Sequence, residues 1–488
     1  MAVVASASLY RPLVIWSSNA WNLSSPSKLL IIAAGLFFVS ILFVAGLRKT
    51  GLDPLAAAIG TATLLLVLLH WHNVAWIGPL PLFALILALT WISHSFRDLP
   101  SLSALAILLI ASLGVAPVAQ LVLAYLTESE PYPLAQLAPR NEAGNRQVVE
   151  DVVVVVIDGY PSLEFAHDKF GHVDDIAQEL EKLGFIVAAS AWTQHTDTSL
   201  ALPSLLELRP VIDEIPDSWD NRTSLIRIMR GDNWVSSTLQ TAGFTYHHIE
   251  SGWDASSCGP TVDRCIQSPW VDEVVWQLLR PSVVGDWLTY RLGTWSTNGG
   301  LNAAKSFADL AEQVLDNGHS DYIFVHVLLP HPPFLLNHSC SIDPSLVERY
   351  LSPAPLRSAD VHQVIAGQLE CADRIIGNIA SVVQHNTALL IVADHGTESL
   401  GQLGRAGYKW TNMEIAERMG VFMAYRFPPS GREPLDATNV EAMRALISCS
   451  VQTDLPTPRK GYLVGFDQES AWIAPERMEI IKALSAGE

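Results

Sequence analysis

The hydrophobic positions in the first quarter of the chain form four long apolar runs. They occupy residues 29–47, 55–73, 75–93 and 103–126. Each approaches the roughly 20 apolar residues that a helix needs to cross the hydrocarbon core of a bilayer. A buried core helix would explain one such run but not four in succession. A secretory signal peptide also fits poorly, because the first run begins late and three more follow. The pattern therefore predicts a membrane anchor over residues 1–127, built as a bundle of about four transmembrane helices.

Beyond residue 150 the pattern changes to buried strands that alternate with helices. The β-branched run VVVVVI is typical of a strand covered on both faces in a parallel sheet. A helical pattern follows over 173–183, and further apolar strands are expected at 185–192, 321–330 and 387–396. This alternation predicts an α/β domain with a mainly parallel sheet flanked by helices. We place the domain at 150–470, after a linker at 128–149 and before a C-terminal tail at 471–488.

Charge divides the chain at the same place. Residues 1–130 carry five basic and four acidic residues, whereas the remainder carries 25 basic and 45 acidic ones. Only 16% of all residues are charged, against about 25% in soluble globular proteins. The net charge of −19 argues against nucleic acid as a partner, because phosphates would repel the chain. The apolar content of the acidic part argues against disorder. We expect the lipid bilayer as one partner.

Basic residues between the apolar runs predict the orientation in the membrane. Loops that carry Arg48-Lys49 and Arg97 would be cytoplasmic by the positive-inside rule, and the chain after the fourth run would then lie outside. Arg11 and Lys28, which precede the first run, count against this orientation.

Cysteines favour the same placement of the rear domain. All five lie in the acidic part of the chain, where Cys258 and Cys265 would close a short disulfide loop suited to an oxidising compartment. A zinc knuckle is the competing interpretation of this pair, although no CxxC motif accompanies it. Cys340 and Cys371 could form a second bridge. We therefore predict an integral membrane protein whose rear domain is extracytoplasmic, either periplasmic or extracellular.

Polar side chains gather where the predicted strands end. Asp158 follows the first strand, Asp394-His395 ends the last, and His326 and His331 lie in and just after the strand between them. Ligands bind beyond the carboxyl ends of strands in open α/β sheets, so these residues share a candidate site. Carboxylates with an imidazole suit Mn²⁺, Mg²⁺ or Zn²⁺. Taken singly, each has a simpler interpretation, and Asp158-Gly alone would be a turn.

A threonine at a strand-to-helix junction adds a nucleophile. Thr198 begins the segment TSLALPSLL, which follows a predicted strand and has helical character. Alone, Thr198 is most simply a helix N-cap, with Asp197 and Thr196 as rivals for that role. The order of Asp158, Thr198 and Asp394-His395 along the chain is more specific than any of its members.

With these motifs in order, the sequence resembles the sulfatase-like branch of the alkaline phosphatase superfamily. Its membrane-anchored members include lipoteichoic acid synthase and the phosphoethanolamine transferases. The resemblance rests on TSLALPSLL, VHVLLPHPPF and VADHGTESLG, with AERMGVFMAYRFP similar to the closing segment of the family. It covers anchor and domain alike, and it implies an alkaline-phosphatase-like (sulfatase-like) fold.

The resemblance also implies roles for individual residues. Asp158, Asp394 and His395 would bind a metal, and Thr198 would be both nucleophile and fourth ligand. His326 and His331 would contact the transferred group or its leaving group. The implied cofactor is one divalent ion, with Zn or Mn favoured over Mg or Ca.

Three departures from the family pattern limit these implications. TSLALPS lacks the Cys or Ser motif that gives formylglycine, which argues against sulfate-ester hydrolysis. The stretch after Asp394-His395 contains Lys409 and no histidine, which argues against a second metal. Glu398 stands one place later than the corresponding family glutamate.

The sequence thus predicts a membrane-bound, metal-dependent hydrolase or transferase. Its substrates would be phosphoester groups, and less readily sulfoesters, of envelope phospholipids or glycans, with a covalent phospho-Thr198 as intermediate. Water as the second acceptor gives a hydrolase, and an acceptor hydroxyl gives a transferase. The alternative from another class is a catalytically inactive sulfatase-fold protein that binds or scaffolds at the membrane.

Overall fold

The structure is a computed structural model of the chain. It describes residues 7–8, 10, 12–15, 26–69, 90, 95, 149–173, 175–211, 223–315, 317–352, 358–399, 405–427, 437–451, 455, 461–465 and 471–485. The linker predicted at 128–149 and the third and fourth apolar runs fall almost wholly outside these residues.

The chain divides into two units that are not simply consecutive. One contains Met1–Glu130 together with Trp270–Arg291, and the other contains Pro131–Pro269 with Leu292–Glu488. The sequence predicts residues 270–291 as part of the rear domain, whereas the structure groups them with the N-terminal residues. We call the first the anchor unit and the second the α/β unit.

The anchor unit contains one helix of membrane-spanning length in its described part. Helix α2 (Pro26–Arg48) is long and apolar enough to cross a bilayer over Lys28–Arg48. Helix α3 (Pro54–Leu69) coincides with the second apolar run, but its 16 residues rise only about 24 Å. The predicted bundle of four spans is therefore reduced to one span and one shorter apolar helix among the described residues. Helices α13 (Glu273–Leu279) and α14 (Val283–Leu292) complete the unit.

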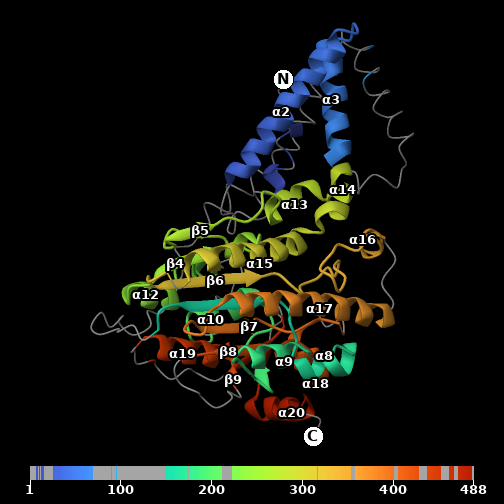
Figure 1. Ribbon diagram of the computed structural model, residues 1–488. Helices are drawn as coiled ribbons and strands as arrows, with labels where there is room; N and C mark the ends of the chain where they lie inside the picture. The colour runs from blue at the N-terminus through green and yellow to red at the C-terminus, as the bar shows by residue number, and fades with distance from the viewer. Residues whose placement is uncertain are drawn as a thin grey trace. The chain divides into compact units, whose positions relative to one another are not determined.

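The α/β unit is built on a mixed, mainly parallel sheet with the strand order β2-β8-β7-β1-β6-β4-β5 (Figure 1). Strand β1 lies at its centre, parallel to both β6 and β7, and is buried along its whole length, as its β-branched run predicts. Among these seven strands β8 alone runs in the opposite direction, so its pairings with β2 and β7 are both antiparallel. Their bounds are β1 (Val152–Ile157), β2 (Ile186–Val187), β4 (Thr245–Ile249), β5 (Arg264–Ile266), β6 (Asp321–Val327), β7 (Ala388–Ala393) and β8 (Met423–Arg426).

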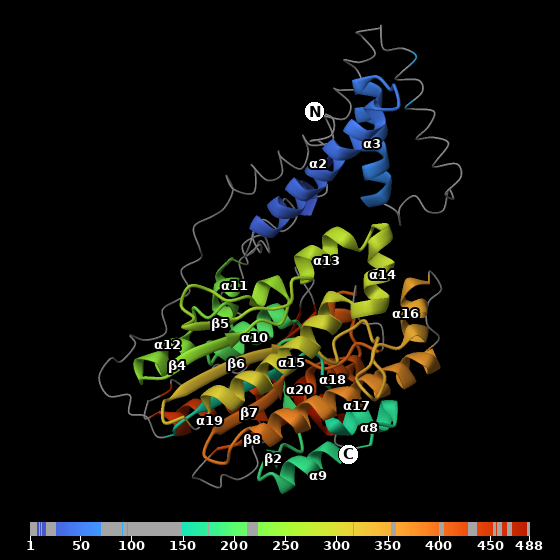
Figure 2. The same cartoon turned by 45° about the horizontal axis from the view of Figure 1, so that its top comes forward.

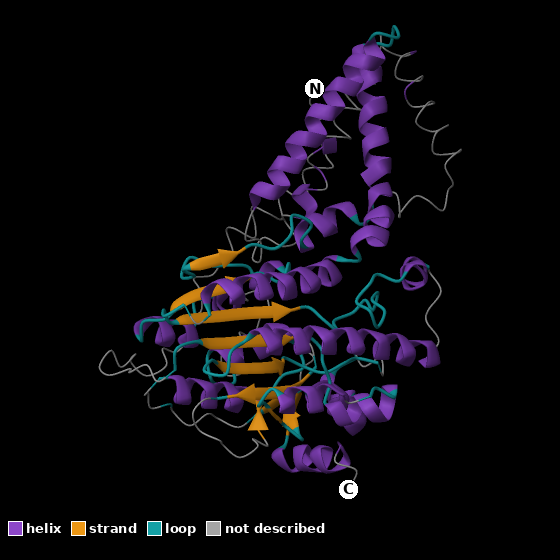
Figure 3. Cartoon of the chain, viewed as in Figure 1, coloured by secondary structure: helices purple, strands orange, loops and turns teal. Residues whose placement is uncertain are grey.

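Helices cover both faces of this sheet (Figures 2 and 3). On one face α15 packs on β6 and on α17, and α17 also contacts α8 and α9. On the other face α19 packs on β7, α12 packs on β4, and α10 contacts both α12 and α19. The helices of the α/β unit are α8 (Leu163–Phe170), α9 (Asp175–Lys182), α10 (Thr198–Leu206), α11 (Thr223–Met229), α12 (Trp234–Thr241), η3 (Asp254–Ser256), α15 (Trp295–Val314), α16 (Pro344–Leu351), α17 (Ser358–Val382), η4 (Gly407–Lys409), α18 (Asn412–Met419), α19 (Asn439–Ser450) and α20 (Pro475–Ser485).

Two parts of the sequence prediction differ from the fold. The strand expected at 185–192 is split, because β2 pairs with β8 whereas β3 (Ala191–Trp192) pairs with β9 (Ala437–Thr438). The predicted tail at 471–488 contains β11 (Ala471–Ile473), paired with β10 (Tyr462–Val464), and α20, which packs on α18. Folded structure therefore continues to Ser485.

Both disulfides expected from the sequence are present. Cys258 bonds to Cys265 across the loop between η3 and β5, and Cys340 bonds to Cys371 of α17. The fifth cysteine, Cys449, is buried in α19. The disulfide interpretation of the first pair is thus confirmed over the zinc knuckle.

Candidate metal-binding active site

The register of the parallel strands brings the predicted acidic residues together. Ile157, the last residue of β1, lies opposite Val327 of β6 and Ala393 of β7. Asp158 and Asp394 therefore leave neighbouring strands side by side, as the strand ends predict. His326 lies opposite Val156 within the sheet and is fully buried. Asp158, His326 and Asp394 offer ligand atoms that all lie within 4.8 Å of one another, a group that can hold a metal ion.

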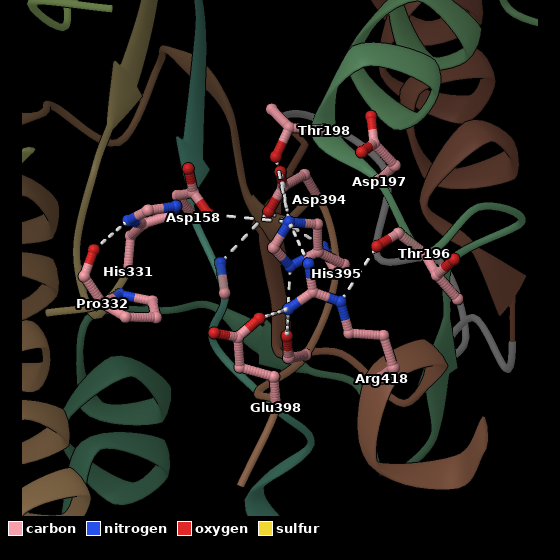
Figure 4. Close-up of polar contacts among 12 residues, drawn as sticks. Asp158, Thr196, Asp197, Thr198, His331, Pro332, Asp394, His395, Glu398 and Arg418 are labelled. Atoms are coloured by element: carbon pink, nitrogen blue, oxygen red, sulfur yellow. Dashed lines mark hydrogen bonds and ion pairs between the residues drawn. The ribbon is translucent and has the colours of Figure 1, made fainter. Parts of the chain in front are cut away.

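The N-cap of α10 is Asp197 and not Thr198. The Asp197 carboxylate accepts a hydrogen bond from the Ser199 amide at 2.8 Å, which satisfies the helix terminus. The Thr198 hydroxyl is therefore available to the site, where its Oγ1 lies 2.9 Å from His395 Nε2 (Figure 4). The local sequence thus puts a capping residue beside a candidate nucleophile.

Hydrogen bonds fix which nitrogen of His395 is available. His395 Nδ1 donates to the Gly396 carbonyl oxygen at 3.0 Å, which leaves Nε2 as an acceptor. Nε2 lies 3.4 Å from Asp394 Oδ2 and 3.7 Å from Asp158 Oδ1. Burial, followed by the charge of Arg418, holds the pKa of His395 well below its ordinary value. The imidazole is therefore neutral, which is the form that binds metals.

The two carboxylates are buried, and each keeps an oxygen without a hydrogen bond. Asp394 Oδ1 accepts from the backbone amides of Gly159 and His395 at 3.1 and 2.8 Å. Asp394 Oδ2 and Asp158 Oδ1 find no hydrogen-bond partner in the described part of the chain. Buried anionic oxygens are costly unless a cation or a donor meets them. These donors therefore fit a divalent ion, and they are carboxylate and imidazole groups, as Zn²⁺ and Mn²⁺ accept.

The charges in the site push the two carboxyl pKa values apart. For Asp158 the upward effect of burial is outweighed, chiefly by the charge of His331 and by the contact with His326, so its pKa is lowered. For Asp394, burial and then the charge of Asp158 raise the pKa. Such a difference is common in paired carboxyl groups, because the negative charge of one disfavours ionisation of the other and raises its pKa.

His326 and His331 occupy different surroundings. His326 Nε2 lies 3.4 Å from Asp158 Oδ2, with both ring nitrogens buried. His331 is only half-buried, and its Nδ1 bonds to the Pro332 carbonyl oxygen, so Nε2 is left to face the site. His326 is therefore placed to contact the carboxylates, whereas His331 is placed to contact an incoming substrate.

Arg418, a residue that the sequence prediction missed, completes the site from α18. Its Nη2 lies 3.1 Å from His395 Nε2, and its Nε and Nη1 donate to the carbonyl oxygens of Thr196 and Gly396 at 2.9 and 2.8 Å. Glu398 lies 3.7 Å from the same guanidinium. A buried guanidinium thus stands beside the candidate nucleophile, joining the loops that carry Thr198 and His395.

The loop after β7 lies tightly against α18. Glu417 accepts hydrogen bonds from the Thr397 hydroxyl at 2.8 Å and from the Ser399 amide at 2.6 Å. A Cβ atom added to Gly396 would lie 2.0 Å from the Glu417 carbonyl oxygen, so only glycine allows this approach. The His395 position therefore depends on a backbone contact.

Gly396→Ala is expected to destabilise the protein by about 3 kcal/mol and to lower activity, since the loop carrying His395 must move. Thermal unfolding and steady-state kinetics measure the two effects. Gly367→Ala is the matched control, because a Cβ there meets nothing closer than 3.9 Å and lies within α17. If Gly396→Ala unfolds at the wild-type temperature, the loop does not need the close approach.

Similarity to known proteins is found among solved structures. No family model and no curated protein matches the chain. Among solved structures, it is similar to the integral membrane protein lipooligosaccharide phosphoethanolamine transferase A from Neisseria meningitidis (14% identity, 93% of this chain and 96% of that chain, TM-score 0.42). It is also similar to the C-terminal periplasmic domain of phosphoethanolamine transferase EptC from Campylobacter jejuni (12% identity, 63% of this chain and 92% of that chain, TM-score 0.39). A 2-O GAG sulfatase gives 7% identity over 63% and 72% of the chains, with a TM-score of 0.41.

The solved structures to which the chain is similar thus include phosphoethanolamine transferases and sulfatases.

Proposed function

We propose that this protein is a membrane-bound, divalent-metal-dependent enzyme that acts on phosphoester groups of envelope lipids or glycans. The observation that carries the proposal is the Thr198 hydroxyl, 2.9 Å from a neutral His395 and next to two buried carboxylates with unsatisfied oxygens. A hydroxyl in such surroundings can become a nucleophile, and a scaffold has no use for it. Helix α2 supports an anchored protein, and the two disulfides support a catalytic unit in the oxidising envelope.

Four residues would hold the cation: Asp158, Asp394, His395 and Thr198. When bound, a divalent ion supplies positive charge that lowers the pKa of the Thr198 hydroxyl and neutralises charge on the phosphoryl oxygens. The raised pKa of Asp394 reflects burial and the like charge of Asp158, which a cation would offset. The lowered pKa of His395, caused by burial and by Arg418, keeps its imidazole in the neutral form that binds metals. Zn or Mn is the favoured ion.

The chain's own residues would carry the transfer in two steps. The Thr198 hydroxyl gives its proton to solvent and regains one when the phosphoester is later cleaved. Thr198 Oγ1 attacks the phosphorus in line, and the phosphorus–oxygen bond to the leaving group breaks, which gives phospho-Thr198. The His331 imidazole faces the leaving oxygen and gives it a proton. Water or an acceptor hydroxyl then attacks the phosphorus, returns a proton to His331 and frees Thr198. The guanidinium of Arg418 adds fixed positive charge beside the reacting oxygens.

Phosphoesters are proposed in preference to sulfoesters because the nucleophile segment begins with threonine. TSLALPS contains serines but lacks the C/S-x-P/A-x-R motif whose Cys or Ser is converted to formylglycine. A threonine alkoxide forms a stable phosphoester, so the intermediate can be isolated and located.

The proposal is tested with purified full-length protein in detergent and a lipid labelled in its headgroup phosphate. Elemental analysis is expected to find a divalent ion. Mass spectrometry of protein that has reacted briefly is expected to find a phosphoryl-linked group on Thr198. Products formed with and without an acceptor glycolipid distinguish transferase from hydrolase. Protein that holds neither ion nor adduct would instead be a catalytically inactive sulfatase-fold protein at the membrane.

A further inference from the structure

Helix α14 presents an exposed aromatic stripe. Trp287, Tyr290 and Val284 are 58%, 45% and 42% exposed, and their spacing of three residues puts them on one side of the helix. The opposite side, with Gly285, Leu288 and Thr289, is buried. Large apolar side chains that are gathered on one helix face, and not scattered, mark a binding surface.

The same segment is fixed to the start of α2. Val274 and Leu278 of α13 form a buried cluster with Leu29 of α2, and Lys28 pairs with Asp272, the N-cap of α13. Trp270, which precedes α13, is 57% exposed. Figures 1 and 2 both draw α13 against this end of α2. The aromatic residues therefore belong to a segment that sits where the apolar helix begins.

Further along, α2 exposes apolar side chains to its surroundings. Leu30, Ile31, Phe38, Val39, Leu42 and Phe43 are each 45–66% exposed. Such exposure is favourable in lipid and costly in water. If α2 crosses the bilayer, its first turn, with Lys28, lies at one membrane surface.

We infer that α14, together with Trp270, is a membrane-surface element that lies in the headgroup layer of the bilayer crossed by α2. This inference rests on the proposed membrane anchoring. Tryptophan and tyrosine are enriched at that depth because their rings are apolar and their N–H and O–H groups remain hydrated. Arg291 is exposed at the end of the stripe and can meet lipid phosphates. Because this segment is attached to the start of α2, the surface that it contacts is expected to be lipid and not a protein partner.

The connectivity of the chain gives this element a role. Residues 270–291 lie between β5 and α15 of the α/β unit, and no apolar run long enough to cross a bilayer separates them. The α/β unit is therefore on the same side of the membrane as α14. An interfacial helix would give this unit a second attachment, so that an enzyme acting on lipid headgroups stays close to them.

The experiment places a fluorescent label at single cysteines of the full-length protein in vesicles of phosphatidylethanolamine and phosphatidylglycerol. The variants are Trp287→Cys on α14, Phe38→Cys on α2 and Val173→Cys, a control that is 67% exposed in the α/β unit. The native cysteines are disulfide-bonded or buried, so labelling is selective. Quenching by lipids brominated near the headgroup is compared with quenching by lipids brominated near the chain end.

The label on Trp287→Cys is expected to be quenched by the shallow bromines at least about twofold more strongly than by the deep ones. The Phe38→Cys label should show the reverse order, and the Val173→Cys label little quenching by either. If the label on Trp287→Cys is quenched no more than the label on Val173→Cys, while the label on Phe38→Cys is still quenched, the inference is overturned and the membrane anchoring by α2 stands. No quenching at Phe38→Cys overturns the anchoring and this inference with it. Phosphoryl transfer is measured separately, so its failure is distinguishable from both.

Discussion

Thr198→Ala is expected to abolish turnover, with a loss on the order of 10⁵-fold or more, as when other covalent nucleophiles are removed. The hydroxyl at 2.9 Å from His395 Nε2 is the group that would attack phosphorus, and alanine has no replacement for it. The fold should persist, because the N-cap of α10 is Asp197 and alanine is the best helix former. Steady-state kinetics, thermal unfolding and mass spectrometry for the phospho adduct measure the three effects.

Thr198→Ser is the matched control, since it keeps a hydroxyl at the same place. It should retain measurable turnover and form an adduct on the new side chain. The alanine variant should still bind metal, because Asp158, Asp394 and His395 remain, and this separates loss of the nucleophile from loss of the cofactor. An alanine variant as active as the wild type would show that another group attacks the substrate.

The positions of the acidic site residues could be predicted because parallel strands end at a common edge. VVVVVI and ALLIVA are apolar without interruption, which is typical of a strand covered on both faces, and the residue that follows such a strand emerges at the edge of the sheet. Asp158 and Asp394 are therefore neighbours by register alone. The roles proposed for them remain predictions.

Arg418 and residues 270–291 could not be predicted in the same way. Arg418 lies on α18, and only packing brings its guanidinium to His395. Sequence spacing carries no signal for such a contact, and the burial of Arg418 is evident only from the structure. Residues 270–291 have apolar positions that are consistent with any surface helix. Their membership of the anchor unit follows from contacts with α2, which are distant in sequence.

The strand expected at 185–192 shows a different limit. Its composition suits a β-strand throughout, but only its two ends pair, and with different partners. Ser190, between them, accepts a hydrogen bond from the Trp192 indole at 2.8 Å. Propensity reports what a segment can form, whereas pairing decides how much of it does.

Asp394→Asn is expected to remove the stabilisation that a bound divalent ion gives, about 2.7 kcal/mol at a hundredfold excess over the dissociation constant. The metal-free variant should be at least as stable as the metal-free wild type at neutral pH. Burial and the charge of Asp158 raise the pKa of Asp394 to about 7, so its ionised form disfavours the folded state. An asparagine Oδ1 can still accept from the Gly159 and His395 amides.

The pH dependence of the stability of the metal-free protein shows whether the Asp394 carboxyl group stabilises or destabilises the fold. A carboxyl group with a raised pKa in the folded state costs stability above that pKa, and the cost disappears as pH falls towards the ordinary value of 3.8. Metal-free wild type should therefore gain stability between pH 7 and about pH 4 through this group, and Asp394→Asn should lack that gain. The lowered pKa of Asp158 acts only below this window. Thermal unfolding of chelated protein over this range, with and without added Zn²⁺ or Mn²⁺, measures both effects.

Asp321→Asn controls for the loss of a buried aspartate outside the site. Asp321 bonds to His247 at 2.6 Å, at the opposite end of β6 from His326. Its replacement should lower stability, because the buried His247 exchanges a carboxylate acceptor for a weaker amide acceptor, yet the gain from added metal should persist. Thus the two aspartates should respond in opposite ways: Asp394→Asn loses the metal effect and keeps the metal-free fold, whereas Asp321→Asn weakens the fold and keeps the metal effect. An Asp394→Asn variant with the full metal effect would place the ion outside the Asp158–Asp394 pair.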